Sequence, residues 1–192
     1  MTIAAALLTI TVRVYDLYGL PQAERDLALQ TAGSILAQAG IEAHFTECQR
    51  PLPDVCLSRL SPGEIVLRIH PDAHARHEVL GAAIINPTGG FNVMATVYGA
   101  AVYERSVTKN VRIGTLAGRV AAHEIGHLLL GKNSHSPHGL MRAHWDVRRT
   151  ALDDWLFSVR DAQTIRRRLV VAGELLRAAD AGAARELETI AD

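Results

Sequence analysis

One short run, His123-Glu124-Ile125-Gly126-His127, has the residue types and the spacing that metal chemistry needs. On a helix each residue turns about 100°, so side chains four positions apart project from the same face. The imidazoles of His123 and His127 can therefore reach one Zn²⁺ ion at about 2.0–2.1 Å. Glu124 points about 100° away from His123, where it can reach a water molecule on the open side of the metal. The spacing predicts two histidine ligands and one general base.

A helix from about Gly114 to Leu130 is expected to carry this run. Its apolar stripe passes through Leu116, Val120, His123 and His127. Without a metal, two histidines on such a stripe would be buried, polar and poorly satisfied. A metal site is therefore favoured over an ordinary amphipathic helix with histidines in the core.

A third protein ligand is needed, because a catalytic zinc site keeps only its fourth position for water. Gly131 follows His127 by four residues and suits the chain reversal that ends a helix. The next residues are rich in Gly, Pro, Ser and His and cannot form regular structure. His135 is the first choice, because a turn at Gly131 can fold it back under the two helical histidines. The alternatives, in order, are His138, His144 and a carboxylate such as Asp146 or Asp154.

The run from His123 to Met141 reads H-E-I-G-H-L-L-L-G-K-N-S-H-S-P-H-G-L-M. It resembles the metzincin clan of zinc peptidases, which use H-E-x-x-H-x-x-G-x-x-H and a methionine turn beneath the metal. Here Gly131 comes one residue late, His135 comes two residues late, and Asn133 stands at the clan's third-ligand position. The compact interval to Met141 is similar to that of archaemetzincins, although the cysteines that follow their third histidine are absent. The segment is also similar to predicted bacterial metalloproteases with H-E-I-G-H-L-L-L-G-x-N-S-H-S-P-x-G-x-M.

This resemblance implies a zinc-dependent endopeptidase in which Glu124 is the general base and His123, His127 and His135 hold Zn²⁺. It implies a peptide or protein as the substrate. Met141 would form a hydrophobic floor under the zinc, and Trp145 would either support that floor or simply pack in the core. Two alternatives stay open: a catalytically silent zinc-binding recognition module, and a non-peptide metallohydrolase on the same scaffold.

The elements that must position the site follow from the rest of the pattern. Alternating and β-branched residues predict three strands, at residues 9–15, 41–46 and 64–69. A helix is expected between the first two strands, from Pro21 to Gly40. A longer strand is expected within 93–107, and the resemblance places it on the cleft edge, where it can pair with an extended peptide. The glycine-containing segment 81–90 would form the upper rim of the cleft.

After residue 150 the chain is expected to be helical, with Thr150 and Asp153 as a capping box. The order strand, helix, strands, helix and helical tail indicates an α+β fold with a mixed β-sheet backed by a helix. With the resemblance, this becomes a zincin-like sheet with a backing helix and an active-site helix, followed by a small helical C-terminal subdomain. We expect one domain, 1–192, with an N-terminal subdomain of about 1–131 and a C-terminal subdomain of about 132–192.

Composition narrows the class of protein. The chain has 192 residues, of which 48% are hydrophobic, and this suffices for one substantial core. Lys+Arg and Asp+Glu both number 20, so the formal net charge is zero. Neither nucleic acid nor an anionic membrane surface is expected as a partner. No apolar run reaches the roughly 20 residues that span a bilayer. The sequence does not indicate the oligomeric state.

Two cysteines, Cys48 and Cys56, flank a loop that contains Pro51 and Pro53. A disulfide across this loop is sterically plausible and would imply an oxidising compartment, whereas two free thiols fit the sequence equally well. The protein would be periplasmic or secreted in the first case and cytoplasmic in the second. The apolar residues 3–8 are short and lack a preceding basic segment, so a lead-in to the first strand is favoured over a signal peptide.

Overall fold

The computed structural model describes residues 8–61, 63–72, 79–85, 93–146 and 152–190. Its centre is a five-stranded mixed sheet in the order β2-β1-β3-β5-β4. The first four strands in this order are parallel, and β4 runs antiparallel to β5 at the edge. The strands are β1 (Leu8–Asp16), β2 (Ile41–Glu47), β3 (Ile65–His70), β4 (Gly81–Ile84) and β5 (Met94–Tyr98).

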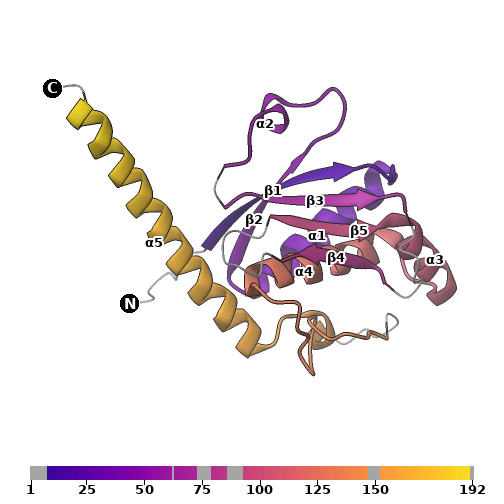
Figure 1. Cartoon of the computed structure of the whole chain (residues 1–192). Coiled ribbons are helices and arrows are strands. Elements are labelled where there is room, and N and C mark those ends of the chain that lie inside the picture. The colour runs from indigo at the N-terminus through magenta and orange to yellow at the C-terminus, as the bar shows by residue number, and fades with distance from the viewer. Residues whose placement is uncertain (1–7, 62, 73–78, 86–92, 147–151, 191–192) are drawn as a thin grey trace, which may run out of the picture.

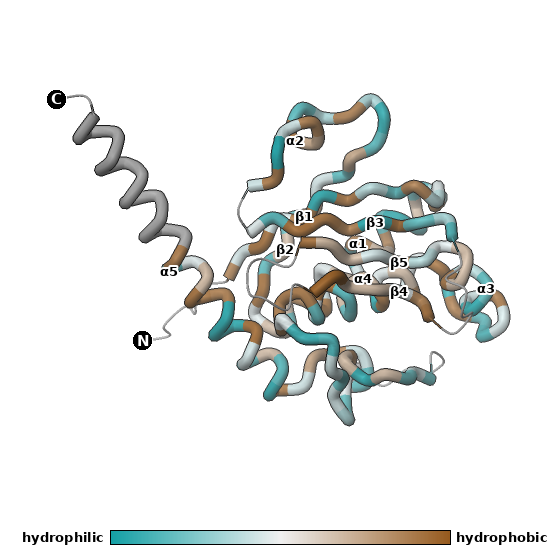
Figure 2. The backbone as a smooth tube through the Cα atoms, viewed as in Figure 1, coloured by the Kyte–Doolittle hydropathy of each residue, from teal (hydrophilic) through white to brown (hydrophobic). Residues whose placement is uncertain are grey.

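Two long helices cover one face of the sheet (Figure 1). The helices are α1 (Gln22–Gln38), α2 (Asp54–Leu57), α3 (Gly99–Lys109), α4 (Ile113–Leu130), the 3-10 turn η1 (Leu152–Trp155) and α5 (Val159–Ile190). Helix α1 connects the parallel neighbours β1 and β2, as a crossover must. Figure 2 shows apolar residues along β1 and α4, where the sheet and the helices enclose the core. These features confirm the expected α+β class with its backing helix.

Close packing of α1 against α4 depends on glycine. A Cβ atom built on Gly118 of α4 would lie 2.4 Å from the carbonyl oxygen of Ala28 and 2.6 Å from the Cβ of Thr31, both on α1. Gly114, one turn earlier, meets the backbone of Glu24 in the same way, with 2.4 Å to the carbonyl oxygen. The absence of side chains at these two positions therefore allows α4 to pack closely against α1.

Gly118→Ala is expected to destabilise the protein by about 1–3 kcal/mol, because an added methyl group must push two helix backbones apart. Inside a helix, Gly→Ala normally raises the free energy of unfolding by about 1 kcal/mol. A decrease on Gly118→Ala would therefore show the clash between the two helices. Gly33→Ala on α1 is the matched control, since its Cβ would meet only Phe45, at an ordinary 3.5 Å. Urea unfolding of both variants tests this, and equal stabilisation by the two substitutions would contradict it.

The strand expected within 93–107 is wrong beyond Tyr98. Strand β5 ends there and α3 begins at Gly99, where a Cβ would lie 2.3 Å from the Tyr18 ring. The buried residues of α3 then recur at helical rather than alternating spacing: Gly99, Ala101, Val102 and Ser106. Strand β5 also lies between β3 and β4, so the cleft edge belongs to β4 instead.

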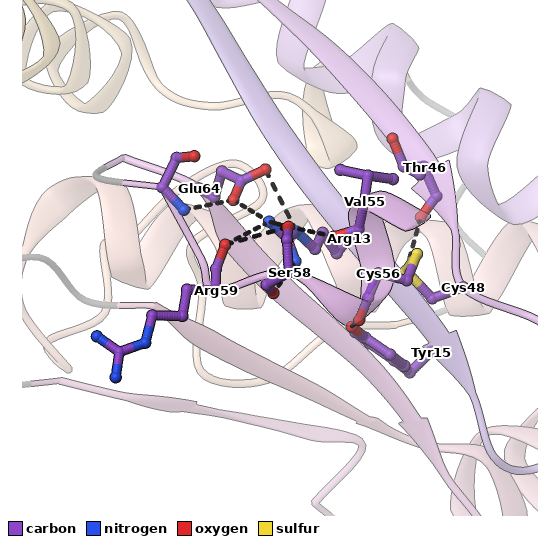
Figure 3. A network of polar contacts seen from close by, with 10 residues as sticks. Arg13, Tyr15, Thr46, Cys48, Val55, Cys56, Ser58, Arg59 and Glu64 are labelled. Carbon is purple, nitrogen blue, oxygen red and sulfur yellow. Dashed lines mark hydrogen bonds and ion pairs between the residues drawn. A yellow bond between two sulfur atoms is a disulfide. The ribbon is translucent and has the colours of Figure 1, made fainter. Parts of the chain in front are cut away.

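On the opposite face of the sheet, β1 contacts the loop between β2 and β3, and Figure 3 shows these polar contacts. Side chains alternate along β1, so Val12 faces the helices and Arg13 faces this loop. Arg13 is only 2% exposed and donates to the Glu64 carboxylate at 2.5 Å and to the Ser58 carbonyl at 2.8 Å. The hydrogen bond from Arg13 holds the pKa of Glu64 below its ordinary value. A buried, fully paired guanidinium therefore anchors the loop.

The same loop contains a disulfide between Cys48 and Cys56. The Tyr15 hydroxyl donates to the Cys56 carbonyl at 3.3 Å, which ties the bridge to β1. The sequence fitted both a disulfide and two free thiols, and the structure has the disulfide. Such a bridge is compatible with an oxidising compartment. None of the helices in the described ranges is long and apolar enough to cross a membrane.

The chain is helical at its end, as expected, and α5 extends well beyond the body of the molecule (Figure 1). Its first turns pack on the domain through buried Ala162 and Ile165. Arg166 donates to the Ala39 carbonyl at 2.7 Å, and Arg168 donates to the Leu129 carbonyl at 3.0 Å. The capping box at Thr150 and the lead-in before Leu8 lie outside the described residues. The division into two subdomains stays a prediction.

Candidate metal centre

The site is built on the second half of α4, which is buried between the sheet and the segment that follows the helix. His123 and Glu124 are each 6% exposed and His127 is 4% exposed. The helix ends at Gly131, which has the left-handed φ of 64° and donates to the Leu128 carbonyl. The turn expected there is confirmed. It reverses the chain and returns the next residues toward the helix.

Backbone carbonyls orient the two helical imidazoles. The Nδ1 of His123 lies 2.9 Å from the carbonyl oxygen of Leu140, and the Nδ1 of His127 lies 2.9 Å from that of Lys132. A carbonyl only accepts hydrogen bonds, so each Nδ1 carries the proton and each Nε2 presents a lone pair. The two Nε2 atoms lie 3.0 Å apart. Both lone pairs are therefore directed into one small space.

The segment after Gly131 brings a third imidazole to the same place. The His135 ring stacks on that of His123 at 5.4 Å and meets that of His127 edge-to-face at 5.0 Å. One nitrogen from each of the three residues lies within 4.8 Å of the others. Within the described ranges this trio is the group suited to a metal ion, and it includes none of the alternatives. Those alternatives are His138, His144, Asp146 and Asp154.

The donor set fits a zinc ion. Burial lowers the pKa of His123 to about 3 and also lowers the pKa values of His127 and His135. All three rings are therefore neutral, the form that binds metal. Two lone pairs 3.0 Å apart repel each other unless a cation lies between them. Tetrahedral Zn²⁺ with bonds of 2.0–2.1 Å separates its ligand nitrogens by about 3.3 Å, close to the 3.0 Å between the Nε2 atoms of His123 and His127.

Glu124 lies beside the trio and beneath the edge strand. A Cβ on Gly81 would come within 2.7 Å of the Glu124 Oε1 and 2.8 Å of its Cγ, so a side chain at position 81 would displace the carboxyl group. In the described part of the chain, no hydrogen bond or ion pair involves this carboxyl. Burial raises the pKa of Glu124 to about 8. The group is thus held in a confined space, with its oxygens available to a ligand in the cleft.

A turn that contains Met141 packs against α4 near the site. Gly139 has a φ of +72°, and the Leu140 amide donates to the Leu156 carbonyl at 2.7 Å. Met141 is fully buried, and its Sδ lies 2.7 Å from where a Cβ on Gly126 would be. Residue 126 stands between the two helical histidines. Only glycine there lets Met141 approach α4 so closely.

Trp145 is linked to the first histidine in two ways. Its indole N–H donates to the Leu140 carbonyl at 2.9 Å, the same oxygen that accepts from His123. Its ring meets the His123 ring edge-to-face at 4.9 Å and also contacts Trp155 at 5.5 Å. Core packing alone would not require this shared carbonyl. Partners of this kind orient metal-binding histidines.

The histidine trio, Glu124 and Trp145 line one cleft of about 620 Å³. Its upper wall is the segment from Val79 to Ala83, which agrees with the expected rim for residues 81–83. Residues 84 and 85 do not line the cleft, and the rest of the expected rim, 86–90, lies outside the described residues. Strand β4 has a partner on one side only among the described strands, so its outer edge pairs with no strand in the described part of the chain. Sequence reasoning did not single out Arg105, which also lines the cleft. The sequence analysis assigned Arg105 to the strand expected within 93–107, which is a helix in this part. The helical spacing of the small residues in α3 was the signal that could have shown this.

Comparisons with known proteins bear on the fold. No protein-family model matches the sequence, and no curated protein matches it. Among solved structures, the crystal structure of archaemetzincin from Methanopyrus kandleri is similar, with a TM-score of 0.56 and 14% sequence identity. The alignment covers 87% of this chain and 99% of that chain. At this identity the likeness establishes the fold alone. The chain has the archaemetzincin-like zincin fold that the sequence led us to expect.

Proposed function

We propose that the protein is a zinc-dependent endopeptidase. The observation that supports this most is the convergence of three neutral imidazole nitrogens within 4.8 Å beside a buried carboxyl group. We assign His123, His127 and His135 as the zinc ligands. We assign Glu124 as the general base. The archaemetzincin-like fold, a scaffold of zincin metalloproteases, agrees with this assignment.

Each residue of this chain has a defined part in the reaction. Zinc, when bound, supplies Lewis-acid chemistry that polarises the scissile carbonyl and acidifies a water molecule. Glu124 accepts the proton of the attacking water and delivers it to the leaving amine. The carbonyls of Leu140 and Lys132 keep the two helical imidazoles in the tautomer that presents Nε2. Met141 lies under α4 and forms the methionine turn.

A peptide is the proposed substrate because the outer edge of β4 pairs with no strand among the described residues. An extended chain can add to such an edge through main-chain hydrogen bonds, which recognise any sequence. The edge lies on the same cleft as the histidine trio and Glu124. A scissile carbonyl held there would lie over the site. A recognition module without turnover would need the histidines but not the carboxyl group beside them.

Zinc-loaded protein is expected to cleave casein and members of a broad peptide library. Removal of the metal with a chelator should abolish cleavage, and added zinc should restore it. Mass spectrometry of the products identifies the bonds that are cut. Failure of fully zinc-loaded protein to cleave any peptide or casein would exclude the peptidase, and peptide binding without cleavage would then favour the recognition module.

A further inference from the structure

One cationic side chain of the cleft is not used by the proposed mechanism. Arg105 lies on α3, is half-buried and lines the same cleft as His123, Glu124 and His127. Its guanidinium makes no hydrogen bond or ion pair in the described part of the chain. A half-buried arginine without a partner leaves five N–H donors directed toward a ligand or solvent.

The other charges on the cleft wall are already engaged. Arg142 donates to the Asp154 carboxylate at 3.2 Å and to the Gly139 carbonyl at 3.2 Å. Glu124 lies beside the histidine trio. On α3 itself, the residues three and four positions from Arg105 carry no carboxylate: Ala101, Val102, Thr108 and Lys109. Among the described residues that line the cleft, Arg105 is therefore the arginine that can pair with a substrate carboxylate.

The sheet defines where Arg105 stands along the cleft. The Tyr98 amide donates to the Leu80 carbonyl at 2.9 Å, so the end of β5 lies beside the start of β4. Helix α3 follows β5 directly and lies at this end of the edge strand (Figure 1). An antiparallel ladder is the commoner and slightly more stable pairing. A peptide that pairs antiparallel with β4 ends its C-terminal half on the side of Leu80 and Arg105.

We propose that Arg105 forms a cationic subsite of the cleft that binds a substrate carboxylate on the C-terminal side of the scissile bond. The inference rests on the proposed peptidase function and names its substrate class, which is acidic peptides. The carboxylate is that of a Glu or Asp side chain or of a free C-terminus, since a guanidinium pairs with both in the same bidentate way.

The test uses quenched fluorescent peptides that differ at one position after the scissile bond, with Glu, Gln or Lys there, and with a free or amidated C-terminus. The wild type should prefer Glu over Gln by roughly tenfold in kcat/KM, the value of a hydrogen bond to a charged group. R105Q should lose this preference and keep its rate on the Gln peptide, and R105E should favour Lys. K109Q, which removes a charge from the exposed end of the same helix, should behave as the wild type. If amidation of the C-terminus lowers the rate and the change from Glu to Gln does not, the carboxylate that Arg105 binds is the free C-terminus.

Three results would overturn the subsite: equal rates for Glu and Gln in the wild type, an acidic preference on the N-terminal side, or an equal loss on all peptides in R105Q. A binding measurement separates this from failure of the peptidase function. Fluorescein-labelled Glu and Gln peptides are titrated with zinc-loaded E124Q, with and without R105Q. Suppose that no peptide is ever cleaved. The subsite is still supported if the Glu peptide binds more tightly than the Gln peptide and R105Q abolishes this difference. Equal binding of the two peptides would exclude the subsite.

Discussion

Glu124→Gln is expected to lower kcat/KM for peptide cleavage by about 10²–10⁴-fold, the contribution of a positioned general base. The amide has nearly the shape of the carboxyl group but cannot accept the proton of the attacking water. Zinc content should stay near that of the wild type, because Glu124 is outside the histidine trio. Kinetics on a peptide substrate and metal analysis of the same preparation measure both quantities.

The control for this variant is Glu42→Gln, the same chemical change on β2 at the opposite edge of the sheet. It should leave both activity and zinc content unchanged. Two outcomes would contradict the assignment of Glu124. One is substantial cleavage by the Glu124 variant, which would require another base. The other is loss of zinc from it, which would make Glu124 a ligand.

The parts of the site that are local in sequence could be predicted from it. Helix α4 and its face follow from residue spacing, because a helix turns by a fixed angle per residue. The chain reversal follows from Gly131, whose φ of 64° is costly for other residues. Of the two extra residues before His135, relative to the metzincin pattern, one lies before Gly131 and the other lies in the segment after this turn. There the Lys132 carbonyl accepts from His127, and the Ser136 amide donates to the Met141 carbonyl at 2.7 Å.

The boundary between β5 and α3 could not be predicted, because residues 99–107 are rich in residues that both strands and helices accept. Contacts with distant residues also act there, and Gly99 packs so closely against Tyr18 that a side chain at position 99 would clash with the ring. Tertiary packing often overrides local propensity in this way. The same error placed β5 at the cleft edge, whereas β4 is the last strand on that side among the described residues.

Contacts between distant segments are the second part that local patterns do not encode. Gly81 leaves space for Glu124 only because the sheet order places β4 over α4. Arg105 reaches the cleft only because α3 lies beside the start of β4. Trp145 shares a carbonyl acceptor with His123 although 22 residues separate them in the sequence. The sequence predicted the histidine trio, whereas the opposite wall of the cleft required the fold.

His135→Ala is expected to lower zinc affinity by more than about 100-fold, because loss of a ligand should cost more than the 10–100-fold typical of its hydrogen-bond partners. The two helical nitrogens would then hold the ion alone. Zinc binding to the folded state raises its stability, so the zinc-dependent rise in Tm should also disappear. Competition with a chromophoric chelator and thermal unfolding with and without zinc measure these effects.

His138→Ala is the matched control, since both histidines lie on the same irregular segment and only His135 belongs to the trio. Its zinc affinity should stay within about twofold of the wild type, because it removes neither a ligand nor a hydrogen-bond partner of one. Near-normal zinc in His135→Ala would remove the third-ligand assignment. If zinc were then lost only on adding His138→Ala or His144→Ala, the substituted histidine would be the ligand. The metzincin-like order of residues would survive that result, whereas the position of the third ligand would move further from the clan's pattern.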